Sequence, residues 1–253
     1  MIKIIEQIRS LQKNLNEKII IGVKTYNRSQ MIRRVVNSLR KTVDPHIPIL
    51  IYDDFSTEPS QVTFLNLLID DATNKNIQVV FHEKNMGSNG NNQRFLDYFF
   101  QNKIQKWILV DDDCSFTKKD WINDIVIQMD ENPHLFIMPK YEEPTGIQHP
   151  HGFFLTGTYE MLRKVGPYDL KSFPLRYGDC HADFTSRCRR LGYGEEARGE
   201  FIDYKKIFGP SANPVHRKRF FPIRAKYDAI VEDESRTSIP WGNGNLNFIG
   251  DKV

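Results

Sequence analysis

Three consecutive carboxylates, Asp111, Asp112 and Asp113, directly follow a short apolar run at residues 107–110. The run is typical of a buried strand. Adjacent carboxylates repel one another and resist the loss of water, so a cation among them would stabilise them. Divalent cations such as Mg²⁺ and Mn²⁺ bind oxygen ligands of this kind. These residues therefore indicate a metal site at a strand end, and they also fit an ordinary solvated turn or a helix N-cap.

A helix–loop–helix calcium site does not fit this stretch. Counted from Asp111, the sixth position of such a loop is Phe116, where a glycine is needed for the sharp turn. The twelfth position is Ile122, where a bidentate glutamate is needed. The metal hypothesis thus depends on the loops that surround the carboxylates.

The chain before the carboxylates alternates segments that are typical of strands with segments of helical periodicity. This alternation predicts right-handed crossovers and a mostly parallel sheet flanked by helices, with an α/β fold class. The loops that follow the strands then gather along one edge, where open α/β sheets bind ligands. The predicted strands cover residues 18–23, 47–52, 78–81 and 106–111, and the predicted helices cover 31–39, 61–69 and 95–100.

The loop after each of these four strands is rich in groups that could bind a ligand. The loop at residues 85–94 lacks the third glycine of a dinucleotide fingerprint and the Gly-Lys-Ser/Thr of a P-loop. It fits either an ordinary helix start or an anion bound at that start. The polar groups of the four loops are Thr25, Asn27 and Arg28; Asp53, Asp54 and Ser56; Asn85 and Gly87–Arg94; and Asp111–Asp113.

Composition places the chain among ordinary globular proteins. Its 253 residues are 40% hydrophobic and 26% charged with a formal net charge of +3, which demands neither nucleic acid nor a membrane as partner. Cys114, Cys180 and Cys188 show no metal-binding or disulfide spacing, which favours a reducing compartment. Residues 1–18 are too polar for a signal peptide, and no window is apolar enough to span a membrane. We expect a cytoplasmic protein whose membrane association, if any, is peripheral.

The second half of the chain has a looser pattern. Residues 117–129, 158–165 and 182–191 predict helices, and residues 135–139 and 152–156 predict strands. The tail has many proline, glycine and basic residues with little periodicity. We therefore expect one domain at 1–207, with halves at 1–113 and 114–207, and a covering segment or lid at 208–253.

With these elements in order, the chain resembles the family 2 glycosyltransferases, which have the GT-A fold of nucleotide-diphospho-sugar transferases. The resemblance runs from about Ile19 to Tyr193 and depends on several ordered motifs. Residues 21–28 are similar to the family's first strand and its Thr-Tyr-Asn-Arg loop. Residues 52–57 are similar to its Asp-Asp-Gly-Ser-Thr segment, with Phe55 in place of glycine, and residues 85–87 match its Asn-x-Gly. Residues 109–113 are similar to its Asp-x-Asp metal motif.

The resemblance implies a donor site. It places Thr25, Asn27 and Asp54 in the base and ribose pocket of a nucleotide-diphospho-sugar, usually a uridine diphosphate (UDP) sugar. It implies that Asp111 and Asp113 hold Mn²⁺ or Mg²⁺ against the diphosphate, because a hard cation neutralises the charge of that leaving group. The candidate third metal ligand is His216. The other residues assigned to donor binding are Arg28, Asp53, Asn85, Gly87, Arg94 and Asp112.

The acceptor side departs from the family pattern. Residues 178–187 resemble the Glu-Asp-x-Asp-Leu-x-x-Arg motif that supplies the general base, but Cys180 and His181 stand where Glu and the basic Asp are expected. A carboxylate one turn earlier, or an imidazole that titrates near neutral pH, could serve instead. Asp183 and Arg187 match the motif, yet this spacing also fits a structural ion pair. The candidates for the base are Asp179, His181 and Asp183.

The sequence thus predicts a metal-dependent, inverting glycosyltransferase of glycan or glycoconjugate synthesis. Its acceptor would be a carbohydrate or another molecule that carries a hydroxyl; the basic clusters at 187–190 and 217–219 leave a nucleic acid acceptor open. A nucleotidyltransferase of related fold is one alternative, although Lys24-Thr25-Tyr26-Asn27 is not its glycine-rich basic loop. A catalytically inactive nucleotide-sugar-binding module is the other alternative. The oligomeric state is not indicated.

Overall fold

A computed structural model of the 253-residue chain describes residues 19–71, 75–119, 121–132, 140–142, 148–150, 154–173, 180–194, 230 and 232–241. The helical pattern before residue 19, the strand predicted at 135–139, and the site candidates Asp179 and His216 lie outside these residues. Within the described residues, no helix has both the length and the apolar composition needed to cross a membrane.

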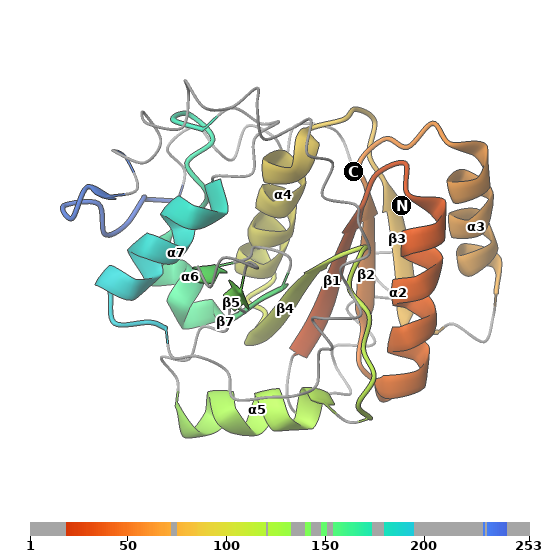
Figure 1. The fold of residues 1–253 in the computed structure, drawn as a ribbon, viewed down its shortest axis with the longest axis horizontal. Helices are drawn as coiled ribbons and strands as arrows, with labels where there is room; N and C mark the ends of the chain where they lie inside the picture. Colours follow the sequence, from red (N-terminus) through yellow and green to blue (C-terminus); the bar gives the residue numbers. More distant parts are fainter. Residues whose placement is uncertain are drawn as a thin grey trace.

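The centre of the fold is a five-stranded sheet with the order β3-β2-β1-β4-β7 (Figure 1). The first four strands along the chain pair in parallel, and β7 joins the edge antiparallel to β4. The predicted α/β class and mostly parallel sheet are confirmed. The strands are β1 (Ile19–Thr25), β2 (Ile49–Asp53), β3 (Ile77–Phe81), β4 (Lys106–Asp111) and β7 (Phe154–Thr158).

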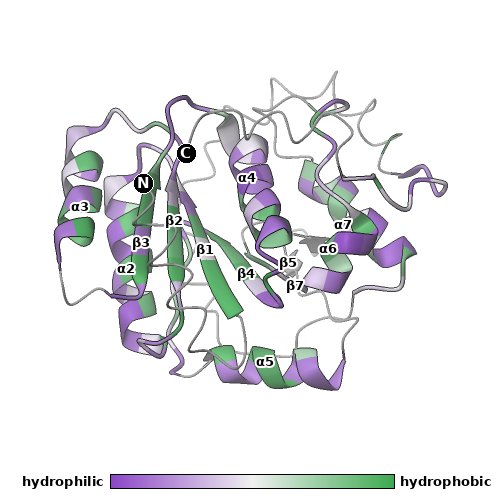
Figure 2. Ribbon diagram, turned by 180° about the vertical axis from the view of Figure 1, so that it is seen from behind, coloured by the Kyte–Doolittle hydropathy of each residue, from purple (hydrophilic) through white to green (hydrophobic). Residues whose placement is uncertain are grey.

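The central strands are apolar along their length because helices cover both faces of the sheet. One hydrophobic cluster joins the sheet to α2 (Ser29–Thr42), α3 (Pro59–Asp70) and α5 (Trp121–Glu131). A second cluster joins the other face to α4 (Gly87–Gln101), α6 (Tyr159–Val165) and α7 (Cys180–Arg190). Figure 2 shows the central strands largely in the green of hydrophobic residues and the helices in a mixture of green and purple.

Close packing places the start of α4 above the strand ends. Gly22 of β1 leaves room for Phe95 of α4, since a Cβ atom at Gly22 would lie 2.7 Å from the Phe95 ring. Phe95 stacks on Tyr52 of β2 with ring centroids 4.0 Å apart. Phe99 stacks in the same way on Trp107 of β4 at 5.5 Å. These contacts fix α4 across β2, β1 and β4, so its N-terminus faces the carboxyl ends of those strands.

The second half of the chain differs in detail from the sequence-based boundaries. The helix predicted from residue 117 begins at Trp121, which stacks on Phe116 with centroids 4.4 Å apart. The strand predicted at 152–156 covers 154–158. The helix predicted at 182–191 begins two residues earlier, at Cys180. A further pair of antiparallel strands consists of β5 (Lys140–Glu142) and β6 (Gln148–Pro150).

Residues 232–241 cover α6 and the end of α4. The Trp241 ring stacks on Phe100 of α4 with centroids 3.9 Å apart, and its Nε1 donates to the carbonyl of Leu162 at 2.9 Å. The backbone N–H of Ile239 donates to the carbonyl of Val165 at 3.1 Å. This described part of the tail therefore packs on α4 and α6.

Candidate functional site

A cavity of about 650 Å³ opens where β1, β2 and β4 end and α4 begins. Because the strands are parallel, Thr25 pairs in register with Asp53, and Lys24 with Asp111, so their loops meet at one edge. The predicted gathering of polar loops is confirmed for these elements. The cavity is lined by Lys24, Thr25, Tyr26, Arg28, Asp54, Asn85, Gly87, Ser88, Asn91, Asp111 and Asp112.

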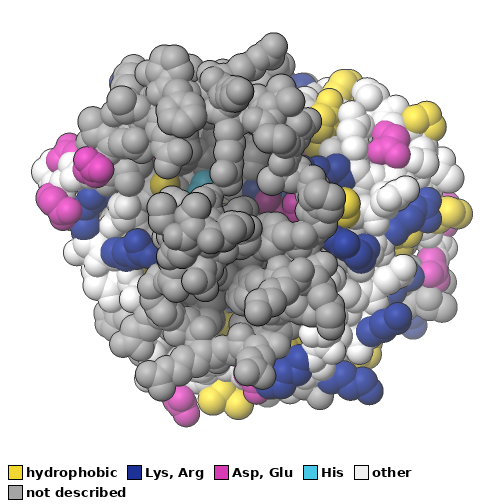
Figure 3. Space-filling model, in the orientation of Figure 1, with side chains coloured by type: hydrophobic (Ala, Val, Ile, Leu, Met, Phe, Trp, Pro, Cys, Tyr) yellow, Lys and Arg dark blue, Asp and Glu magenta, His cyan; other side chains and the backbone are white. Residues whose placement is uncertain are grey.

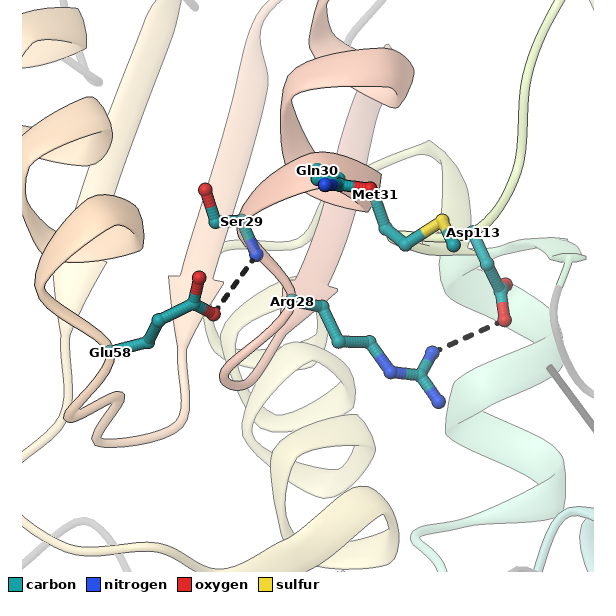
Figure 4. A pocket seen from close by; sticks show the side chains of 6 residues that line it. All are labelled: Arg28, Ser29, Gln30, Met31, Glu58 and Asp113. Carbon is teal, nitrogen blue, oxygen red and sulfur yellow. Dashed lines mark hydrogen bonds and ion pairs between the residues drawn. The ribbon is translucent and has the colours of Figure 1, made fainter. Parts of the chain in front are cut away.

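A smaller pocket of about 290 Å³ lies beside this cavity and shares Arg28 with it. Figure 4 shows the Arg28 side chain pointing toward Asp113 from the loop before α2. On the other side of the pocket, Glu58 accepts a hydrogen bond from the backbone N–H of Ser29 at 3.2 Å. Asp113 thus faces this neighbouring pocket, while Asp111 faces the larger cavity.

The three consecutive carboxylates have different environments. Asp112 is buried, and it accepts hydrogen bonds from Thr25 Oγ1 at 2.7 Å and Arg28 Nη1 at 3.1 Å. The side chains of Asp111 and Asp113 are 26% and 23% exposed. Asp111 Oδ1 lies 2.9 Å from Lys24 Nζ, and Asp113 Oδ2 lies 3.2 Å from Arg28 Nη1. The outer two carboxylates are therefore accessible to a cation, whereas Asp112 holds the loop together.

Burial shifts the pKa values of two of these carboxyl groups. It raises the pKa of Asp112 to about 7, against the opposing effect of the Arg28 cation. Burial also raises the pKa of Asp113, and the nearby negative charge of Asp111 adds to that effect. Within the described residues, no set of three or more His, Cys, Asp and Glu side chains is arranged to hold a metal ion. A metal on Asp111 and Asp113 would complete its coordination from the donor, from water or from residues outside this part of the chain.

Asp54 directly follows β2, which is separated by β1 from β4 and its carboxylates in the sheet. It is 2% exposed and accepts hydrogen bonds from the backbone N–H of Met86 at 2.8 Å and from Arg94 Nη1 at 3.4 Å. Burial raises the pKa of Asp54. Arg94 thus acts on the cavity through Asp54 and does not itself line it.

Two residues assigned to donor binding organise loops. Asp53 is fully buried and accepts from the backbone N–H of Ser56 and from Gln61 Nε2, both at 2.7 Å. Asn27 has a left-handed backbone with φ of 48°, and its Oδ1 accepts from the backbone N–H groups of Thr57 and Glu58 at 2.8 and 2.9 Å. Neither residue lines the cavity. Their side-chain oxygens accept hydrogen bonds from the β2–α3 loop and from Gln61, and their assignment to donor binding stays a prediction.

The sequence reasoning missed Lys24, which lines the cavity, and Gln61, which donates to Thr25 and Asp53 beneath it. Gln61 of α3 is fully buried, and its Nε2 also donates to Ser56 Oγ at 2.7 Å. Lys24 Nζ donates to Ser88 Oγ at 3.0 Å. At the same end of α4, Asn85 Oδ1 accepts from the backbone N–H of Gly87, which has φ of 70°. The available signal was the presence of a lysine at the end of an otherwise apolar strand.

In the acceptor half, Asp183 is part of a buried ion cluster. Its Oδ2 accepts from Arg187 Nε at 2.9 Å, and its Oδ1 accepts from Arg236 Nη2 at 3.0 Å. Asp183 and Arg187 are both fully buried. Arg236 also pairs with Asp169 at 2.8 Å. The structural ion pair is thus the observed arrangement, and both carboxylate oxygens of Asp183 accept hydrogen bonds from arginines.

The other two candidates for the base are His181 and Asp179. His181 lies in the first turn of α7 and is half-buried. Asp179, like the candidate metal ligand His216, is outside the described residues. The choice among Asp179, His181 and Asp183 stays a prediction.

Basic side chains lie along the face that carries α2 (Figure 3). Several of them have partners within the fold. The Arg33 guanidinium lies 4.3 Å from the centre of the Phe64 ring, and Arg34 Nη2 donates to the carbonyl of Asp113 at 3.1 Å. Both arginines thus have partners within the described part of the chain.

Solved structures share this architecture. The chain is similar to GalNAc-T7 with UDP, GalNAc and Mn²⁺, with a TM-score of 0.59 and 14% identity over 73% of this chain and 42% of that one. It is similar to PcManGT, a mannosyltransferase from Pyrobaculum calidifontis in complex with GDP-Man and Mn²⁺. Here the TM-score is 0.61 and the identity 12%, over 93% of this chain and 76% of PcManGT. It is also similar to S. aureus TarS 1-349 in complex with UDP-GlcNAc, with a TM-score of 0.54 and 18% identity over 73% of this chain and 57% of that one. The chain thus spans less than half of GalNAc-T7.

The sheet, its flanking helices and these similarities define a GT-A fold, which confirms the fold predicted from the sequence. The model of glycosyl transferase family 2 matches residues 20–189, more than half of the chain. The chain belongs to this family. None of the curated proteins matches it.

Proposed function

We propose that this protein transfers a sugar from a nucleotide-diphospho-sugar to a hydroxyl group of an acceptor. The observation that supports this most is the cavity at the strand ends, which brings Thr25, Asp54 and Asp111 to one space. We propose a UDP-sugar as donor, and a carbohydrate or another molecule bearing a hydroxyl as acceptor. Membership of glycosyl transferase family 2 supports the reaction class, and the solved structures with UDP, UDP-GlcNAc or GDP-Man support the donor class.

The carboxylates fit a divalent cation. Asp111 and Asp113 offer hard oxygen donors, and about a quarter of each side chain is exposed. Asp112, between them, is held inward by Thr25 and Arg28, which leaves the outer two as the pair that would hold Mn²⁺ or Mg²⁺. When bound, the cation would neutralise the diphosphate as it leaves.

The chain's own residues perform the other tasks. Thr25 and Asp54 line the side of the cavity that we assign to the base and ribose, and Asn85 and Gly87 shape the start of α4 beside it. We propose a single displacement with inversion at the anomeric carbon. Asp179 or His181 would remove the proton of the acceptor hydroxyl as its oxygen attacks.

One observation favours a second function, that of a nucleotide-sugar-binding module without catalysis. Asp183 matches the family motif that supplies the base, yet it is fully buried within an ion cluster. If neither Asp179 nor His181 removes a proton, the cavity would bind a donor without turning it over.

Measuring the release of nucleoside diphosphate from a panel of nucleotide-sugars in Mn²⁺ tests the proposal. We expect release in the wild type, its loss with EDTA, and a fall of about a hundredfold in Asp113→Asn. Asp130→Asn is the matched control, because Asp130 pairs with Lys106 at the opposite end of β4. Release that is unaffected by EDTA or by Asp113→Asn would contradict metal-dependent transfer. Tight binding of a nucleotide-sugar without release would favour the binding module.

A further inference from the structure

Lys24 has an unusual position for a lysine. It is the sixth residue of β1, and the five residues before it are isoleucine, valine or glycine. Lys24 is 9% exposed, so nearly all of its side chain is removed from water. Burying an ammonium group is costly unless it is paired and hydrogen-bonded. Packing alone does not explain a cation at this place.

The partners of Lys24 belong to the donor cavity. Its Nζ lies 2.9 Å from Asp111 Oδ1 and donates to Ser88 Oγ at 3.0 Å. Lys24, Ser88 and Asp111 all line the cavity. Asp111 is also one of the two carboxylates that fit a metal ion. The Lys24 ammonium therefore already supplies, beside Asp111, positive charge of the kind that a divalent cation would supply.

The neighbouring helix end favours an anion near the same point. The 15-residue helix α4 begins at Gly87, whose backbone N–H donates to Asn85 Oδ1. The N-cap residue Met86 provides no side-chain cap, and its own N–H donates to Asp54 Oδ1. The partial positive charge of a helix N-terminus attracts phosphate. Ser88, which accepts the hydrogen bond from Lys24, is the second residue of this helix. An ammonium that leaves Asp111 while staying near Ser88 would face a phosphate bound there.

We propose that Lys24 is an internal counter-ion of the donor site, which neutralises Asp111 in the free protein and contacts the donor diphosphate when a divalent cation takes Asp111. This inference rests on the proposed function. Two cations within about 3 Å of one carboxylate repel each other, so the metal and the ammonium compete for Asp111. A bound diphosphate supplies the negative charge that the released ammonium needs.

The proposal predicts effects of opposite sign in Lys24→Met, which keeps the length of the side chain and removes its charge. Without a competitor at Asp111, Mn²⁺ alone should bind about fivefold more tightly. Without the ammonium, UDP should bind about tenfold more weakly in saturating Mn²⁺, the condition in which Lys24 is released from Asp111. Titration of Mn²⁺ followed by electron paramagnetic resonance and calorimetry of UDP measure the two affinities separately. Lys24→Arg should keep the UDP affinity within about threefold of wild type, because it retains a cation.

Lys106→Met is the matched control. Lys106 is in the same sheet, pairs with Asp130 at 2.6 Å, and its side chain is 12% exposed against 11% for Lys24. We expect both affinities to be unchanged in this variant. Thermal unfolding of each variant shows whether it is folded before the titrations.

The outcomes separate this inference from the proposed function. Tighter Mn²⁺ binding with weaker UDP binding in Lys24→Met supports the counter-ion. Unchanged affinities, or both affinities weakened together, overturn it while the wild type still binds Mn²⁺ and UDP. A wild type that binds neither Mn²⁺ nor UDP overturns the counter-ion and the proposed function together.

Discussion

The buried ion cluster at Asp183 allows a sharp test of whether this residue is structural or catalytic. Asp183 is 0% exposed and accepts from Arg187 at 2.9 Å and Arg236 at 3.0 Å. Arg187, also fully buried, donates in addition to the carbonyls of Val165 and Pro167. Asp183→Ala leaves the charge of Arg187 without its buried partner. Losing one partner of a buried pair costs about 3–5 kcal/mol, so we expect the free energy of unfolding to fall by about 4 kcal/mol.

Urea denaturation followed by circular dichroism measures this loss. Asp183→Asn keeps one oxygen for the cluster but no charge, and we expect about half of the loss seen with Ala. Glu160→Gln is the control, because Glu160 and Arg163 form an exposed pair whose removal should leave the denaturation midpoint unchanged. If Asp183→Asn unfolds like the wild type but loses all sugar transfer, Asp183 is the base and the structural reasoning is wrong.

Three other residues give further predictions. Burial raises the pKa of Asp97 to about 7 from its ordinary 3.8, so the folded state holds the proton more tightly and stability falls as pH rises from about 4 to about 7. Asp97→Asn should remove the contribution of Asp97 to this slope, so its free energy of unfolding relative to wild type should be about 2–4 kcal/mol more favourable at pH 8 than at pH 5 in urea denaturation; an unchanged slope would refute it. Gly22→Ala should cost about 1–3 kcal/mol, because its Cβ would lie 2.7 Å from Phe95; a wild-type midpoint would show that α4 shifts freely. Gln61→Leu should cost about 2 kcal/mol, since Asp53 would lose a buried donor; no change in thermal unfolding would contradict this.

The alternation of strands and helices was enough to predict the sheet and the edge at which its polar loops meet. This succeeded because the parallel strands are apolar on both faces, which leaves an unmistakable run at each of β1, β2 and β4. The separate roles of Asp111, Asp112 and Asp113 could be predicted only in part. Nothing in three identical side chains says that the middle one accepts from Thr25, 87 positions earlier in the chain.

The residues that sequence reasoning missed could not be predicted for one physical reason. Lys24 and Gln61 are polar, and polar residues are usually exposed. Each is buried here because its partners come from distant segments: Ser88 is 64 positions from Lys24, and Thr25 is 36 positions from Gln61. Arg236 likewise reaches Asp183 across 53 positions. Such partners depend on the tertiary fold, which local periodicity does not contain.

The most direct test of the central claim is a crystal structure of the protein with Mn²⁺ and UDP, with the metal located by its anomalous signal. We predict one Mn²⁺ within coordination distance of Asp111 and Asp113 and in contact with the diphosphate, and a uracil ring on the Thr25 and Asp54 side of the cavity. An anomalous peak away from both carboxylates, or UDP bound elsewhere on the protein, would contradict the account.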